Sequence, residues 1–246
     1  MSGHSKWSTI KRKKETTDIA RGKVFSKHSK AIAVSVKQGG GKVPSTNYKL
    51  RIAIDQAKSD NMPKSNIDKA INRGDSAADY DEVIYEGFGP EGVNIMVVAA
   101  TDNKNRTAQE MKSLFDKRGG RLAGPGAVSF NFESKGMLLI EKASDVDEQT
   151  LKLIDLGVED YEITDDGIEA YIDPSNVGNL KDKLEETGYK LITVELVNNP
   201  KSFQNINDKG VAERILKLLQ AINDHEDVQK VYANADIDDE ILKSIS

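Results

Sequence analysis

A run of cations near the N-terminus carries the clearest chemical signal in this sequence. Lys11-Arg12-Lys13-Lys14 places four positive charges in succession, and Lys6 and Trp7 precede it. Lysine and arginine displace the counterions around phosphates, so such a run is typical of nucleic-acid binding. Trp7 could stack on bases or anchor the segment on its own protein. A solubilising tail is the alternative, but an acidic protein gains little solubility from gathering its cations at one end, and we expect a polyanion partner.

A second set of cations recurs with helical spacing over residues 18–38. Four lysines share one face at about 100° per residue, here named the lysine stripe: Lys23, Lys27, Lys30 and Lys37. The opposite face carries mostly apolar side chains, with Arg21 near them: Val24, Phe25, His28, Ile32 and Val36. A charged face is the default for a surface helix, but no Asp or Glu stands between Asp18 and Asp55. This purity of sign favours phosphate contact for the lysine stripe.

Two glycine-rich segments invite comparison with phosphate-binding loops. Segment 86–92 contains acidic residues and lacks a following Lys-Ser/Thr, which indicates a turn between strands. Segment 119–126 follows Arg118 and contains Arg121. A helix C-cap and a turn explain most of its glycines, and its two arginines mark it as a candidate second contact loop.

Residue types that would support catalysis are sparse. The three histidines are His4, His28 and His225, and none has a second histidine at metal-ligand spacing. The chain has no cysteine, which excludes thiolate metal sites, cysteine nucleophiles and disulfides. No nucleophile elbow, Walker loop or dinucleotide fingerprint occurs in its required context. We therefore expect no enzyme activity, no cofactor, no metal site and no small-molecule substrate.

Charge is distributed unevenly along the 246 residues. Residues 1–75 hold 17 Lys and Arg against 6 Asp and Glu, whereas residues 143–246 hold 10 against 24. A polyanion would therefore bind the first part, while the last part would repel it. The N-terminus has no apolar signal segment, and the longest apolar stretch, residues 95–100, is far shorter than the ~20 residues that cross a bilayer. These features predict a cytoplasmic protein without membrane contact.

The N-terminal elements that must position the cations are predicted to be helical. Residues 1–16 offer little that could pack, so they are expected to form a flexible basic arm. One helix is predicted over 18–38, with Thr17 as its N-cap and the glycines at 39–41 ending it. Further helices are expected after Pro44 and from Pro63 to Gly74, which makes residues 17–75 a helical domain.

Beyond residue 79 the apolar pattern alternates, which predicts strands. They are expected at 83–88, 93–101 and 127–132, with a helix at 108–117 that begins at the capping-box pattern Thr107-Ala108-Gln109-Glu110. Residues 134–204 then follow the order β-α-β-β-α-β, which is ferredoxin-like. Residues 205–240 supply a helix and a strand that complete a discontinuous α/β domain with residues 79–133. The expected fold class is α+β: a basic N-terminal helical bundle and two ferredoxin-like α/β sandwiches, one inserted into the other.

Motifs recur in order over residues 2–133. They include Gly3-His4-Ser5-Lys6-Trp7, Arg21-Gly22-Lys23, Gly39-Gly40-Gly41, Asn61-Met62-Pro63-Lys64, Tyr85-Glu86-Gly87-Phe88-Gly89-Pro90 and Thr101-Asp102-Asn103. Together they resemble the YebC-type (YebC/PmpR) regulators, a family that includes the mitochondrial translational activator of cytochrome c oxidase. The resemblance implies three domains, namely a helical N-terminal one and two ferredoxin-like ones. It also implies a nucleic-acid-facing surface that includes these residues: Lys6, Trp7, Lys11, Arg21 and Lys23.

Two functions remain open. The resemblance favours a non-enzymatic, DNA-binding transcriptional regulator, whose partner would be duplex DNA. The alternative is a ribosome-associated translation factor that binds ribosomal RNA through the basic N-terminal domain and relieves stalling at proline-rich stretches. Lysine suits backbone charge better than base reading, and no recognition-helix signature is present, which favours the alternative. The acidic α/β domains would then be free to contact ribosomal proteins.

Overall fold

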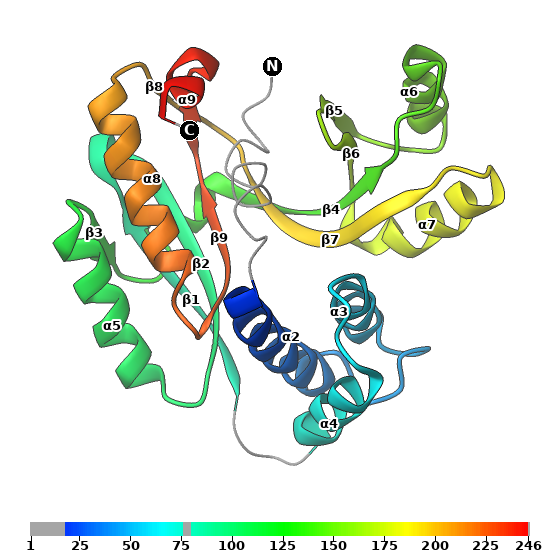
Figure 1. The fold of residues 1–246 in the computed structure, drawn as a ribbon, viewed down its shortest axis with the longest axis horizontal. Coiled ribbons are helices and arrows are strands. Elements are labelled where there is room, and N and C mark those ends of the chain that lie inside the picture. Colours follow the sequence, from blue (N-terminus) through cyan, green and yellow to red (C-terminus); the bar gives the residue numbers. More distant parts are fainter. Residues whose placement is uncertain (1–17, 76–79, 246) are drawn as a thin grey trace. The chain divides into compact units, whose positions relative to one another are not determined.

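The computed structural model describes residues 18–75 and 80–245 (Figure 1). Its contacts divide the chain into two compact units. One comprises residues 133–199, and the other comprises the described residues up to 132 together with residues 200–245. The fold is mixed α+β, with three helices first and then two antiparallel sheets with helices. In the described chain, no helix is long and apolar enough to cross a membrane.

Three helices form the N-terminal part of the larger unit: α2 (Asp18–Gln38), α3 (Tyr48–Ser59) and α4 (Lys64–Asp75). The bounds of α2 confirm the predicted 18–38, whereas its expected cap, Thr17, lies outside the described residues. Apolar positions of the three helices and their connections meet in one core: Ile32, Val36, Leu50, Ala53, Ile54, Ala57, Met62, Ile67 and Ala70. Gly74 brings α4 close to α2, because a Cβ there would lie 2.6 Å from the carbonyl oxygen of Ala33.

Asn47 fixes the connection between α2 and α3. Its side-chain oxygen accepts a hydrogen bond from the Leu50 amide at 3.0 Å, as an N-cap does. Its side-chain amide donates to the carbonyl oxygens of Ser35 and Gly41, both at 2.8 Å. The helix expected after Pro44 therefore begins at Tyr48, where these three bonds hold its first turn.

A four-stranded sheet forms the centre of the larger unit. Its order is β3-β1-β2-β9, with β1 (Asp81–Phe88), β2 (Asn94–Thr101), β3 (Arg121–Ala123) and β9 (Val228–Ala233). All three strand pairings are antiparallel. Helices α5 (Lys104–Lys117) and α8 (Lys209–Asn223) cover one face of the sheet, where Phe115 and Ile215 are fully buried (Figure 1). The short strands β8 (Gln204–Ile206) and β10 (Ala235–Ile237) pair in parallel, and α9 (Asp239–Ile245) follows.

Two sequence predictions in this unit are wrong. The helix expected at 108–117 begins at Lys104, because Asn103 rather than Thr107 caps it and accepts from the Arg106 amide at 3.1 Å. The strand expected at 127–132 is instead a turn that leads into a 3-10 turn at Ser129–Asn131. In that turn Phe130 is 69% exposed, although the alternating pattern suggested that it faces the core.

The smaller unit follows the predicted order β-α-β-β-α-β. It consists of β4 (Phe132–Ile140), α6 (Val146–Asp155), β5 (Asp160–Thr164), β6 (Gly167–Ile172), α7 (Val177–Glu186) and β7 (Leu191–Pro200). The sheet order is β5-β6-β4-β7, and β6 pairs antiparallel with both β4 and β5. Gly136 of β4 packs against Val177, because a Cβ at this position would overlap the valine side chain.

The chain enters and leaves the smaller unit at adjacent points. Strands β4 and β7, its first and last, are hydrogen-bonded neighbours. Just outside them, the Lys201 amide donates to the Asn131 carbonyl oxygen at 2.7 Å, and the Ser202 hydroxyl donates to the Asn131 side chain at 2.7 Å. These bonds hold the two crossing segments together.

Candidate nucleic-acid interface

The structure describes only part of the predicted interface. Six of its residues lie outside the described residues: Lys6, Trp7, Lys11, Arg12, Lys13 and Lys14. Arg21 lies in the first turns of α2, and its side chain is likewise not described. Lys23, two residues further on, has an exposed side chain.

The remaining lysines of the lysine stripe contact the protein itself. The Lys27 ammonium donates to the carbonyl oxygen of Asn223, at the end of α8, at 2.6 Å. The Lys37 ammonium donates to Asp81, at the start of β1, also at 2.6 Å. Lys30 is buried at 9% exposure and donates to Asp227 at 2.6 Å. In this structure Lys30 is thus paired with a buried aspartate, and phosphate contact by this lysine stays a prediction.

Asp227 is the centre of a buried ion-pair cluster. It immediately precedes β9, and its side chain is 1% exposed. One carboxylate oxygen accepts from Lys30, and the other accepts from Arg106 at 3.0 Å and from the Thr107 hydroxyl at 2.7 Å. The cluster thus connects α2 of the helical region to α5 and to the strand end before β9.

The electrostatics of Asp227 favour its charged form. Burial alone would raise the pKa of its carboxyl group, because desolvation penalises the charge. The hydrogen bonds from Lys30, Thr107 and Arg106 outweigh that cost and hold the pKa well below its ordinary value. The aspartate is therefore ionised throughout the physiological range, and its cations remain paired.

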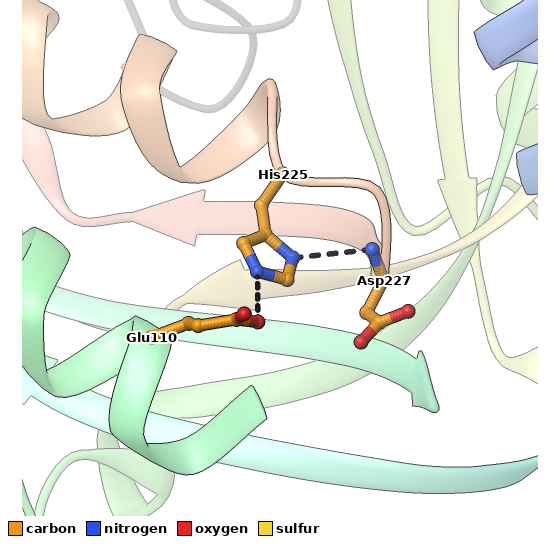
Figure 2. A group of neighbouring side chains, drawn as sticks. All are labelled: Glu110, His225 and Asp227. Carbon is orange, nitrogen blue, oxygen red and sulfur yellow. Dashed lines mark hydrogen bonds and ion pairs between the residues drawn. The ribbon is translucent and has the colours of Figure 1, made fainter. Parts of the chain in front are cut away.

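Three side chains next to this cluster could in principle ligate a metal ion. Ligand atoms of Glu110, His225 and Asp227 all lie within 4.8 Å of one another. Figure 2 shows the His225 ring between the other two: its Nε2 lies 2.9 Å from Glu110, and its Nδ1 accepts from the Asp227 backbone amide at 3.1 Å. The histidine nitrogens and both Asp227 oxygens thus have partners. Since Lys30 and Arg106 flank the carboxylate, the group fits an ion-pair network better than a cation site.

The candidate second contact loop is shaped by a buried glutamate. Arg118 and Arg121 both have exposed side chains, and the Arg121 guanidinium lies 5.6 Å from the centre of the Phe88 ring. Glu86, on β1, accepts hydrogen bonds from the backbone amides of Gly126, Val128 and Ser129 at 2.8, 2.6 and 2.8 Å.

These bonds determine the charge of Glu86. Burial would raise the pKa of its carboxyl group, but the three amide hydrogen bonds more than offset this and lower it below its usual range. The carboxylate bends the backbone into the turn that exposes Phe130. Sequence reasoning placed Glu86 in the strand at 83–88 and the turn that follows it, without a role for its carboxylate, and it gave no role to Asp227. Arg106 and Thr107, whose side chains both bind Asp227, stand 121 and 120 residues earlier in the chain, so no local pattern connects them to it.

The architecture defines a class of protein with a helical N-terminal region followed by α/β structure. In this class one α/β unit, here residues 133–199, lies in the chain between two stretches of the other unit. Residues 80–235 match the TACO1/YebC second and third domain, and residues 5–77 match the TACO1/YebC N-terminal domain. The chain therefore belongs to the TACO1/YebC family.

Relatives of similar length extend along the whole chain. A probable transcriptional regulatory protein from Dictyoglomus thermophilum is 49% identical over 251 residues, covering 100% of both chains. Another of that description, from Thermotoga maritima, is 43% identical over 250 residues, covering 100% of this chain and 98% of the relative. The crystal structure of a conserved hypothetical protein from Aquifex aeolicus matches with a TM-score of 0.84 and 40% identity, covering 92% of this chain and 94% of that one.

Proposed function

We propose that this chain is a non-enzymatic, nucleic-acid-binding regulator of gene expression that acts in the cytoplasm. The observation that carries the proposal is the concentration of cations in residues 1–75 of an otherwise acidic chain. Relatives that carry the printed description of probable transcriptional regulatory proteins support the regulatory role. The proposed contact residues in the arm and in α2 are Lys6, Trp7, Lys11, Arg12, Lys13, Lys14, Arg21 and Lys23. Arg118 and Arg121 form the proposed second contact.

The proposed domain arrangement follows the sequence analysis. Residues 1–16 form the arm, residues 17–75 the helical domain, residues 79–133 with 205–240 a discontinuous α/β domain, and residues 134–204 the inserted one. Both α/β domains are proposed to be ferredoxin-like. Both α/β domains are acidic, so we expect their surfaces, apart from the loop that carries Arg118 and Arg121, to avoid phosphates and to be free to contact ribosomal proteins.

One observation favours RNA on the ribosome as the target over duplex DNA. A helix that reads bases must insert a free face into the major groove. On α2, however, the face that carries Lys27 and Lys30 packs on the protein itself, through Asn223 and Asp227. Backbone contacts by an arm and by exposed lysines suit structured RNA. The alternative function is therefore a ribosome-associated translation factor that relieves stalling at proline-rich stretches.

The single tryptophan, Trp7, makes a label-free test. Its fluorescence is titrated at physiological salt with purified ribosomes and, in parallel, with mixed-sequence duplex DNA. Saturation by ribosomes at far lower concentration supports the translation role, and the reverse supports the transcriptional role. No change with either would contradict nucleic-acid binding through the arm.

Deletion of residues 2–16 is the matching perturbation. We expect most polyanion binding to be lost while the fold is retained, because the arm offers little apolar surface to a core. Binding is measured by sedimentation with ribosomes and by fluorescence anisotropy of labelled duplex DNA, and folding by urea denaturation. Unchanged affinity, or loss of cooperative unfolding, would refute the role given to the arm.

A further inference from the structure

A polar groove lies between α2 and α4 in the helical region. Its volume is about 510 Å³, and the described residues that line it are Ser29, Asn66, Lys69, Ala70, Asn72 and Arg73. Two lining residues are cationic, two are amides and one is a hydroxyl, so every polar side chain among them can donate hydrogen bonds. None of the described lining residues is a carboxylate.

Small side chains make room for the groove. The two helices approach most closely where Gly74 packs on the backbone of Ala33. One turn earlier on each helix stand Ala70 and Ser29, and both line the groove. Because neither side chain is long enough to fill the space between the helices, the longer residues form its walls.

The cationic wall lies on one side of α4. Asn66, Lys69 and Arg73 are spaced i, i+3 and i+7, which places them on one face of the helix. Asp68, the acidic residue within this stretch, is not among the residues that line the groove, although it stands one turn before the lining residue Asn72. Within the described part of the chain, the side chains of Asn66, Lys69 and Asn72 have no hydrogen-bond or ion-pair partner.

Lys69 differs from Lys27, Lys30 and Lys37 of the lysine stripe in the availability of its charge. Lys30 and Lys37 are neutralised by Asp227 and Asp81, and Lys27 is bonded to a carbonyl oxygen. Lys69, by contrast, is exposed. An anion that approaches the helical region therefore meets positive charge at Lys69 of α4, as it does at Lys23 of the stripe.

We propose that the groove between α2 and α4 binds a phosphodiester group of nucleic acid. The guanidinium of Arg73 can donate a fork of two hydrogen bonds to one phosphate, and Lys69 adds a point charge. Asn66, Asn72 and Ser29 supply further donors for phosphate and sugar oxygens. The site is a backbone contact, so it adds affinity and register without reading sequence. The inference rests on the proposed nucleic-acid-binding function and adds a further contact to those proposed in the arm, on α2 and at Arg118 and Arg121.

The test compares two variants that remove charge from α4, one double and one single. The double variant Lys69→Gln, Arg73→Gln removes both positive charges of the wall. Lys64→Gln is the control, because Lys64 lies on the opposite side of the same helix from Arg73. Affinity is measured over a range of salt concentrations with a fluorescein-labelled 20-nucleotide single-stranded RNA and with a 20-base-pair duplex DNA, both of mixed sequence. Losing the one phosphate contact should reduce the log–log salt slope by about 0.7 on the RNA or about 0.9 on the duplex. The control should change it by less than about 0.3.

A second readout reports on the groove directly. The side-chain amides of Asn66 and Asn72 are followed by nitrogen-15 NMR in the full chain while inorganic phosphate or a dinucleotide monophosphate is added. We expect saturable shifts at both amides that disappear in the Lys69→Gln, Arg73→Gln double variant. Equal shifts with a poly-glutamate peptide would show that the groove accepts any carboxylate, and would overturn the assignment to phosphate.

The outcomes separate this inference from the proposed function. If the full chain binds both probes but the double variant and Lys64→Gln behave alike, the groove is not a contact and the proposed function still stands. If the full chain binds neither probe at physiological salt, both are wrong. If deletion of residues 2–16 weakens binding and the double variant weakens it further, with the lower salt slope, the arm and the groove are separate contacts.

Discussion

Replacing Asp227 by Asn removes the one negative charge that Lys30 and Arg106 share. Asn keeps the shape, but it exchanges one acceptor oxygen for a donating amide, so either Lys30 or the Arg106 and Thr107 pair loses its acceptor as well as the charge. Breaking a buried ion pair by removing one partner costs about 3–5 kcal/mol, because the other charge is left buried and uncompensated. The Lys30 side chain is 11% exposed and that of Arg106 is 40% exposed, so Arg106 can recover hydration while Lys30 largely cannot. We therefore expect the low end, about 3 kcal/mol.

Native-state hydrogen exchange of α2 and β9 amides measures this loss where it occurs, and urea denaturation followed by circular dichroism measures it globally. A double-mutant cycle with Lys30→Met should give a coupling energy of about 1–3 kcal/mol. Lys112→Met, which breaks the exposed i,i+4 pair with Asp116, is the control and should cost no more than about 0.5 kcal/mol. A cost below about 1 kcal/mol for Asp227→Asn, or additivity with Lys30→Met, would refute the account of the cluster.

The same variant has a pH signature. The native pKa of Asp227 lies below that of an unfolded aspartate, about 3.9, so the unfolded chain binds a proton first as the pH falls. Its contribution to stability is therefore complete above about pH 5 and is lost progressively in more acidic solution. The free energy of unfolding should fall more steeply between pH 5 and pH 3 in the wild type than in Asp227→Asn. Parallel pH profiles would show that the carboxylate titrates normally in the native state.

Two further changes test other parts of the fold. Glu86→Gln exchanges a carboxylate for an amide beneath three backbone N–H groups, which should cost about 2–4 kcal/mol and speed exchange of the Val128 and Ser129 amides by about 30-fold or more; unchanged protection would mean that the turn does not depend on the charge. Gly136→Ala forces the Val177 side chain to move and should destabilise the unit of residues 133–199 by about 1–3 kcal/mol, seen in exchange of β4 and α7 amides. Nucleic-acid affinity should not change in Gly136→Ala, and a parallel loss of binding would argue that this unit contributes to the interface.

Local patterns predicted most of the elements. The period of α2 and the glycines that follow it predicted both of its ends, and the order of the elements in residues 134–204 was predicted as well. These elements depend on side chains that are close in sequence, such as the apolar face of a helix or the alternation of a strand. The helix α5 was misplaced because Asn103 and Thr107 are both good capping residues four positions apart, and periodicity does not choose between them.

The partners of polar side chains were the harder problem. The pattern correctly placed Lys30 on a face of α2, but its partner Asp227 stands 197 residues further along the chain. Residues 127–132 alternate like a strand, and the carboxylate that bends them into a turn comes from Glu86, 40 or more residues earlier. A hydrophobic pattern shows that a side chain is on a face, and only the tertiary fold shows what that face meets.

The bonds between Asn131, Lys201 and Ser202 bear on how a segment can be inserted into this chain or removed from it. Because the entry and exit of residues 133–199 are held side by side, the rest of the larger unit does not need that segment to keep its two ends together. Closing a loop costs little more entropy as the loop lengthens, so a segment of this size can be accommodated at such a point at small expense to its host. The same geometry would allow a short hairpin to replace the whole segment. It would also allow residues 133–199 to be exchanged for the corresponding segment of a relative.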